Sequence, residues 1–172
     1  MTLPYAWRIT KYNPALRNSQ GHYLAEDWTD FSDIGKTFSG QKLTYKDYLS
    51  VENSYVASAI GFLSDAGLSS LRVTTLENSR LAHIKPNQLR DIAVSPSSIQ
   101  LKSVVSNELE DVVRMNLRGI LWCQLTEASR FYLHFGWDYY MYIGSVSPSL
   151  AAIKNAELSG LFVEEMFSPY LK

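Results

Sequence analysis

The sequence predicts an α+β fold: a single domain, residues 1–172, with a largely antiparallel sheet and two or more amphipathic helices packed against it. Three observations predict this class. Several short segments alternate apolar and polar residues, as strands do, while two longer segments repeat apolar residues every three or four positions, as helices do. The strands predicted near the C-terminal end are joined by short connections, which favour antiparallel neighbours. A chain of 172 residues also fits one domain of ordinary size.

The first third of the chain predicts one strand and one long helix. Residues 5–9 alternate in character, which indicates a half-buried strand, and no clear period follows until about Lys42. Thr44 and Asp47 have the spacing of a capping box, and Gly67 can end the helix in a left-handed conformation. The predicted apolar face of this helix consists of Tyr48, Val51, Tyr55, Ala59 and Phe62.

The middle of the chain alternates between short elements and a second helix. Strands are predicted over residues 71–75 and 99–101, and Pro86 is placed to begin a short helix that ends at Arg90. The second amphipathic helix is predicted to begin near Ser106 and to end at Gly119. Its early acidic and late basic residues suit the helix macrodipole.

The remaining segments complete the predicted sheet. Strands are expected over residues 120–126, 131–135 and 139–143, and a helix over residues 148–158. Residues 161–167 fit either a helix or a strand.

Composition limits the classes of function. The formal net charge is −1, so no overall basic field would attract nucleic acid or an anionic membrane. Cys123 is the only cysteine, which excludes an intramolecular disulfide and favours a reducing compartment. Neither a signal sequence nor a membrane-spanning stretch is evident. We therefore expect a soluble cytoplasmic protein that contacts neither nucleic acid nor membrane.

No motif for catalysis, metal or cofactor emerges. Gly35-Lys36-Thr37 resembles the end of a phosphate-binding loop, but the required earlier glycine is replaced by Asp30, so a turn is predicted. His22, His83 and His134 lack metal-ligand spacing. His134 is expected to face solvent or to fill a polar site. Cys123 lies in an apolar strand, where a buried and inert thiol is the expected state. The sequence thus predicts no catalytic residue, no cofactor and no metal ligand.

The segment from residue 26 to residue 33 is unusual because it combines four carboxylates with two aromatic side chains. One interpretation is a solvated loop that its aromatic residues pin to the core. The other is a binding surface for a cationic protein, in which aromatic residues supply contact area and carboxylates supply charge complementarity. The candidate partner-binding residues are Glu26, Asp27, Trp28, Asp30, Phe31 and Asp33.

A second aromatic run extends from Phe135 to Tyr142. It lacks the neighbouring lysines and arginines that would hold nucleic-acid phosphates. Alternating aromatic residues are typical of a strand with one face in the core and the other packed or in contact. The run therefore favours a sheet strand over a nucleic-acid site.

Three segments share a further feature: Tyr5 to Pro14 (YAWRITKYNP), Glu26 to Lys36 (EDWTDFSDIGK) and Phe135 to Gly144 (FGWDYYMYIG). They resemble a family of small bacterial proteins, some of whose members act as immunity proteins beside contact-dependent growth inhibition or related polymorphic toxins. The resemblance implies an antitoxin that binds a cognate toxin domain, often a nuclease, and it carries over no functional residues.

Two other classes of function remain open from the sequence. One is a cryptic small enzyme, a transferase or hydrolase, whose catalytic groups meet only in the folded chain. The other is a small-ligand-binding domain with a cleft lined by tyrosine and tryptophan. A deep pocket that gathers His134, Cys123 or several carboxylates would favour an enzyme. A continuous acidic surface without a pocket would favour the immunity function.

Overall fold

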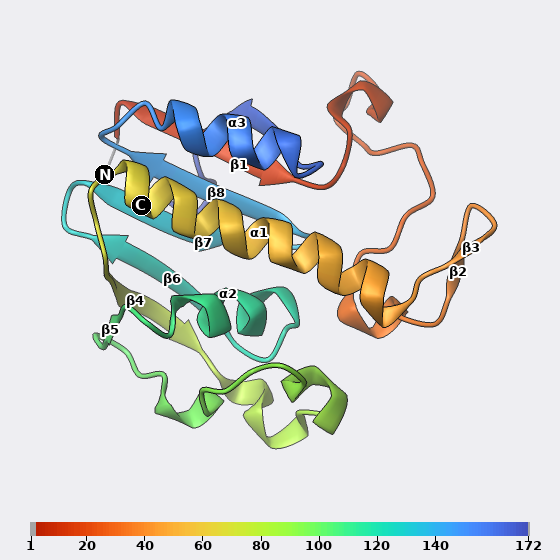
Figure 1. The fold of residues 1–172 in the computed structure, drawn as a ribbon, viewed down its shortest axis with the longest axis horizontal. Helices are drawn as coiled ribbons and strands as arrows, with labels where there is room; N and C mark the ends of the chain where they lie inside the picture. The colour runs from red at the N-terminus through yellow and green to blue at the C-terminus, as the bar shows by residue number, and fades with distance from the viewer. Residues whose placement is uncertain (1–2, 172) are drawn as a thin grey trace.

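A computed structural model, which describes residues 3–171, shows an α+β fold in which three helices lie against one face of a seven-stranded antiparallel sheet (Figure 1). The strand order is β5-β4-β6-β7-β8-β1-β9, and a separate two-stranded hairpin, β2-β3, projects beyond one end of the longest helix. The predicted fold class is confirmed. The strands are β1 (Tyr5–Thr10), β2 (Thr37–Phe38), β3 (Gln41–Lys42), β4 (Leu71–Glu77), β5 (Val104–Val105), β6 (Trp122–Glu127), β7 (Phe131–Phe135), β8 (Tyr140–Ser145) and β9 (Phe162–Glu165).

The longest helix, α1 (Tyr45–Asp65), runs across the middle of the sheet (Figure 1). Thr44 and Asp47 form the predicted capping box, with each side chain bonded to the other's backbone N–H. Gly67 follows the helix with a φ of 66°, which glycine adopts without the steric cost of a Cβ atom. Four of the five residues predicted for its apolar face are buried and the fifth, Val51, is half-buried, so this element was correctly predicted.

The two shorter helices are α2 (Leu109–Leu117) and α3 (Leu150–Leu158). Each begins slightly later than the sequence indicated: α2 begins three residues after Ser106, with Glu108 at its N-cap. Gly119 follows α2 with a φ of 66° and ends it as predicted. Both helices pack against α1, and the three helices bury the apolar side of the sheet.

The C-terminal half forms the centre and one edge of the sheet. β6, β7 and β8 pair in sequence as an antiparallel meander, as their short connections predicted. β1 inserts between β8 and β9, so the first strand of the chain lies beside the last. The segment for which helix and strand were both open is therefore a strand.

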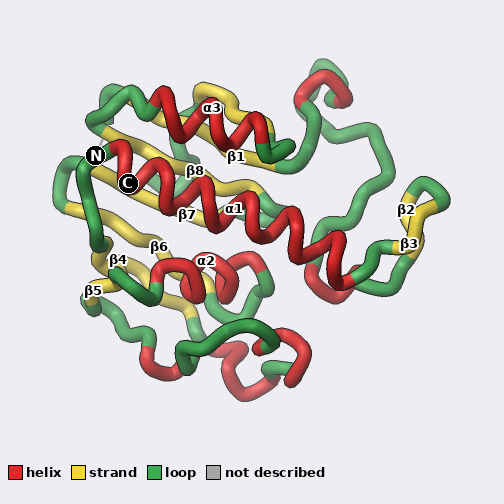
Figure 2. Tube along the Cα trace, in the orientation of Figure 1, coloured by secondary structure: helices red, strands yellow, loops and turns green. Residues whose placement is uncertain are grey.

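One predicted strand is wrong. Residues 99–101 are not in the sheet; Ile99 is buried in the main core, whereas Leu101 is exposed, and the two-residue strand β5 follows instead. An alternation of three residues is too short to indicate a strand when tertiary contacts decide the pairing. The surrounding segment, residues 78–103, consists mainly of loops and short 3-10 turns (Figure 2).

The sheet face opposite the helices has a small aromatic core of its own. Tyr132 and Tyr142 are buried there with Leu3, and Tyr170 and Leu171 from the C-terminal segment pack over them. This segment closes one part of the second face. None of the helices in residues 3–171 combines the length and the hydropathy needed to cross a membrane.

Candidate functional site

The aromatic residues of the acidic segment are anchored in the core. Trp28 is 7% exposed and Phe31 is 4% exposed, and both rings pack against Tyr48 of α1. These two candidate binding residues cannot provide contact area to a partner without leaving the core. The structure therefore supports the interpretation that they pin the loop.

Three of the four carboxylates in this segment hold the loop itself. Glu26 accepts a hydrogen bond from the backbone N–H of Ser39. Asp33 accepts hydrogen bonds from two backbone N–H groups and from Lys36, and these contacts hold its pKa below the usual value although partial burial opposes them. Asp27 forms an ion pair with Lys11, at 2.6 Å between Oδ2 and Nζ. These carboxylates therefore have internal roles.

Lys11 is enclosed beside this loop. Its ammonium group lies 3.9 Å from the centre of the Trp28 ring and 4.2 Å from that of Tyr12, in addition to its pair with Asp27. Burial lowers the pKa of Lys11 to about 8 despite the raising effect of Asp27. Lys11 directly follows β1, so its contacts with Asp27 and Trp28 attach the loop to that strand.

The fourth carboxylate, Asp30, lines a recess with a volume of about 310 Å³. One of its oxygens accepts a hydrogen bond from the backbone N–H of Ser32 and caps a 3-10 turn. Other walls come from the end of β4, the end of α2, the start of β6, the β7–β8 turn and the C-terminal segment. The recess thus gathers residues that are distant in sequence, and among the six candidate residues only Asp30 lines it.

The β7–β8 turn forms the rim of the recess and has an unusual backbone. Asp138 and Tyr139 have φ values of 56° and 63°, the left-handed conformation that a two-residue hairpin turn of type I′ requires. Glycine and asparagine are the usual residues there, and a bulky side chain at positive φ is strained by about 1–3 kcal/mol. The strain persists because Tyr139 is buried, its hydroxyl donates to Tyr48, and its carbonyl accepts from Tyr55.

This turn holds Trp137 in the solvent. Its side chain is 75% exposed, whereas the other three tryptophans are buried or half-buried. Neighbouring residues on both sides are fixed by the hairpin and by Tyr139, so Trp137 is presented on a rigid element. An exposed tryptophan on a rigid rim has the character of an anchor for binding.

The recess carries more negative than positive charge. Asp30, Glu77 and Asp138 line it, and Arg80 is its only lysine or arginine. Within residues 3–171, none of these four side chains belongs to an ion pair shorter than 4.0 Å. Neither Cys123 nor His134 is among the lining residues.

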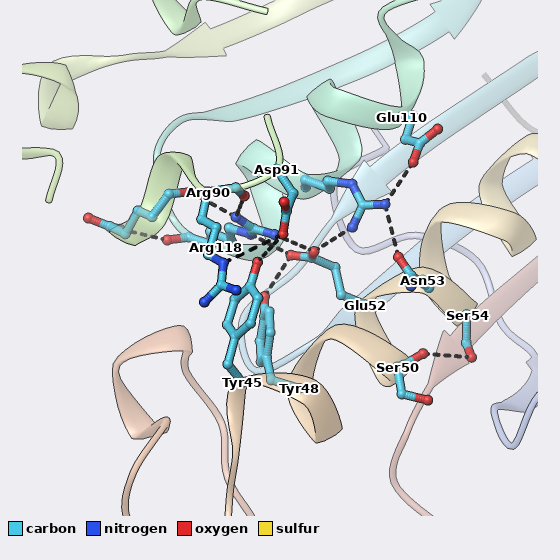
Figure 3. Close-up of polar contacts among 12 residues, drawn as sticks. Tyr45, Tyr48, Ser50, Glu52, Asn53, Ser54, Arg90, Asp91, Glu110 and Arg118 are labelled. Atoms are coloured by element: carbon cyan, nitrogen blue, oxygen red, sulfur yellow. Dashed lines mark hydrogen bonds and ion pairs between the residues drawn. The ribbon is translucent and has the colours of Figure 1, made fainter. Parts of the chain in front are cut away.

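A second polar cluster is centred on a buried carboxylate, and its charged groups already have partners (Figure 3). Glu52 of α1 has no exposed surface; it accepts hydrogen bonds from Arg114, Arg118 and the hydroxyl of Tyr48. Burial would lower the pKa of Arg118, but its contacts with Glu52 outweigh burial and raise it. Because every charged group here has a partner, the cluster is structural.

The cluster also fixes the loop-rich segment that carries Arg80. The guanidinium of Arg118 donates to the backbone carbonyls of Gln88 and Arg90, and the carbonyl of Arg118 accepts from the Gln88 side chain. The sequence predicted only that late basic residues, here Arg114 and Arg118, would suit the helix end, and it indicated no role for Glu52. Its position within the apolar face of α1, one turn after Tyr48, was the available signal.

Cys123 and His134 occupy enclosed positions, whereas His22 and His83 are exposed. Cys123 has no exposed surface, and burial raises its pKa to about 11, so the predicted inert thiol is supported. His134 is 3% exposed and fills a polar site, with Nδ1 2.9 Å from the hydroxyl of Ser168. Burial lowers the pKa of His134 to about 4. Over the described part of the chain, no three His, Cys, Asp or Glu side chains are grouped to hold a metal ion.

Comparisons of the chain with family models, with curated proteins and with solved structures found no match.

Proposed function

We propose that this protein is an immunity protein that binds a cognate bacterial toxin domain and neutralises it by stoichiometric association in the cytoplasm. The binding surface is the recess together with its rim, the β7–β8 turn. The observation that carries the proposal is Trp137, a tryptophan that is 75% exposed on a turn whose strained backbone is held by buried contacts. Strain of this kind is concentrated at functional sites, and exposed tryptophans are frequent anchors of protein interfaces.

The position of the resembling segments supports the same surface. Residues 26–36 supply Thr29 and Asp30 to the recess, and residues 135–144 supply its rim. The third segment, residues 5–14, pairs with β8 and carries Lys11, which holds the acidic loop in place. Two of the three segments, which are far apart in the chain, therefore meet at the recess.

The charge of the surface favours a basic partner. The recess has three carboxylates and one guanidinium, although the whole chain has a formal net charge of only −1. Nuclease toxins fit this requirement because a protein that binds a polyanionic substrate carries a basic surface. Charge complementarity of this kind accelerates association and selects among partners.

The test is whether the chain protects cells against a toxin domain, which the proposal expects the neighbouring gene to encode. Cells that express this domain are expected to survive only with the chain present, and calorimetry is expected to give a one-to-one complex. Trp137→Ala is expected to weaken the complex by about 30-fold or more, since a tryptophan anchor contributes about 2 kcal/mol or more. Leu158→Ala, which removes a similarly exposed apolar side chain on α3, is the matched control. Absence of both protection and a complex would contradict the proposal.

A second candidate function is the binding of a small molecule. The aromatic lining of the recess favours it: Trp122 and Tyr170 pack edge to face there, with their ring centres 5.6 Å apart, and Phe135 and Tyr139 are close by. The volume, about 310 Å³, lies at the lower end of the range for small-molecule sites. Saturable binding of a metabolite without any toxin partner would favour this alternative.

A further inference from the structure

The recess has three carboxylates that form no ion pair within 4.0 Å in residues 3–171. Asp30, Glu77 and Asp138 belong to three separate segments, and each is exposed to solvent. Their convergence is a product of the fold and not of an acidic stretch of sequence. Like charges gathered on a partly enclosed surface favour a cationic occupant, because the low-dielectric walls strengthen the field.

Arg80, the one cation that lines the recess, is stabilised by the end of a helix. A Cβ atom on Gly119 would lie 3.5 Å from Nη1 of Arg80, so this guanidinium lies at the C-terminal end of α2. The helix macrodipole places partial negative charge at that end and favours a cation there. None of the three carboxylates forms an ion pair within 4.0 Å among residues 3–171, so their oxygens are open to a cation from outside.

Aromatic side chains complete the chemistry of the recess. Trp137 stands on the rim, and Trp122 and Tyr170 line the walls. The faces of tryptophan and tyrosine rings attract cations, most strongly that of tryptophan. A guanidinium is planar, stacks on such faces and bonds carboxylates through two N–H groups at once, whereas an ammonium group makes point contacts.

We propose that the recess binds the side-chain cation of a basic residue, with arginine preferred to lysine, and that the toxin domain supplies this residue. The source of the cation rests on the function proposed above. The preference for a guanidinium rests only on the carboxylates, the aromatic walls and the volume of the recess. A site of about 310 Å³ accommodates one long side chain and leaves Trp137 to contact the surface around it.

The chemical preference can be measured without the toxin. The probe is N-acetyl-arginine methylamide, and its matched control is N-acetyl-citrulline methylamide, which has nearly the same shape without the charge. The indole N–H signals of the chain in nuclear magnetic resonance spectra report binding, and Trp137→Phe identifies the signal of the rim. The arginine probe is expected to shift this signal saturably with a dissociation constant on the order of 1 mM, and the citrulline probe to bind at least tenfold more weakly.

Substitution of Asp138 tests whether its carboxylate contributes to binding of the arginine probe. Asp138→Asn is expected to weaken the arginine probe several-fold and to leave the citrulline probe unchanged, and asparagine is tolerated at the left-handed φ of this position. Glu157→Gln, an exposed carboxylate on α3 outside the recess, is the control and should change neither. Equal affinity for the two probes, or no saturable shift with arginine, would overturn the inference.

Combining this measurement with the protection assay separates the two proposals. Arginine binding without any protein complex would uphold the guanidinium preference and contradict the toxin as its source. Protection by a chain that does not discriminate arginine from citrulline would overturn the inference and leave the immunity function standing.

Discussion

The carboxylate of Glu52 on α1 has no exposed surface. It pairs with Arg114 of α2 and with Arg118, which directly follows that helix. Glu52→Gln is expected to lower the free energy of unfolding by about 3–5 kcal/mol, since it leaves two buried guanidinium groups without their carboxylate. Urea unfolding at neutral pH measures the loss. Glu110→Gln, which removes the half-exposed partner of Arg114, is the control and should cost less than about 1 kcal/mol. Similar losses in both variants would show that the buried cluster does not stabilise the fold.

His134 makes the stability of the protein depend on pH. Its pKa is about 4 in the folded chain and near 6.5 when exposed, so the folded state disfavours the proton. The neutral ring therefore contributes its full stabilisation above pH 6.5. This stabilisation falls as the pH decreases, and the loss reaches about 3 kcal/mol near pH 4. The neighbouring titratable groups, Tyr132 and Tyr170, remain protonated throughout this range.

The measurement is the free energy of unfolding between pH 4 and pH 7 for the wild type and for His134→Gln. The variant is less stable at pH 7 because glutamine does not reproduce the contacts of the ring, but its stability should depend less steeply on pH. Carboxylates that titrate in this range affect both proteins alike and cancel in the comparison. Parallel curves would contradict a buried neutral histidine.

At the scale of elements, glycine-to-alanine substitution is expected to change the stability of the fold in opposite directions at two positions. A Cβ atom at Gly144 of β8 would overlap the buried ring of Tyr132 on β7, so Gly144→Ala is expected to destabilise the chain by about 1–3 kcal/mol. A Cβ atom at Gly61 of α1 would lie 3.6 Å from that of Ala152, an ordinary contact, and alanine favours a helix by up to about 1 kcal/mol. Gly61→Ala should therefore stabilise it. Thermal unfolding of the two variants tests both, and equal shifts in the melting temperature would refute this account.

The elements that sequence predicted well are those whose residues determine their own structure. The helix that begins after Thr44 has a capping box, a regular apolar face and a glycine stop, all within one stretch of sequence. The strand expected over residues 99–101 was wrong because its pairing depended on distant partners, and Ile99 found a place in the core outside the sheet. Residues 161–167 were undecided for the same reason, since β9 exists through its pairing with β1.

The recess could not be predicted because its walls come from separate parts of the chain. The sequence singled out Asp30 as a candidate, but within a set whose other carboxylates hold the loop and whose aromatic residues are buried. Glu77 and Arg80 have no local feature that marks them. Trp137 was noted only as part of an aromatic run, and its exposure follows from the turn conformation, in which Tyr139 stands where glycine is usual.

At the scale of the whole molecule, we propose that a nearly neutral chain binds a basic protein through a locally acidic recess. The most direct test is the rate of association with the toxin domain as a function of ionic strength, followed by stopped-flow fluorescence. The comparison is between the wild type and the combined variant Asp30→Asn, Glu77→Gln and Asp138→Asn. Asparagine preserves the cap at position 30 and is compatible with the turn at position 138, and unchanged thermal stability of the variant is the control.

The wild type is expected to associate faster than the variant by about tenfold or more at low salt, and to lose this advantage as salt screens the carboxylates beyond a Debye length of about 8 Å. The variant should associate slowly and with a weaker dependence on salt, because its interface lacks the charges that steer the encounter. Identical rates and identical salt dependence for the two proteins would show that the recess does not face the partner and would contradict the account.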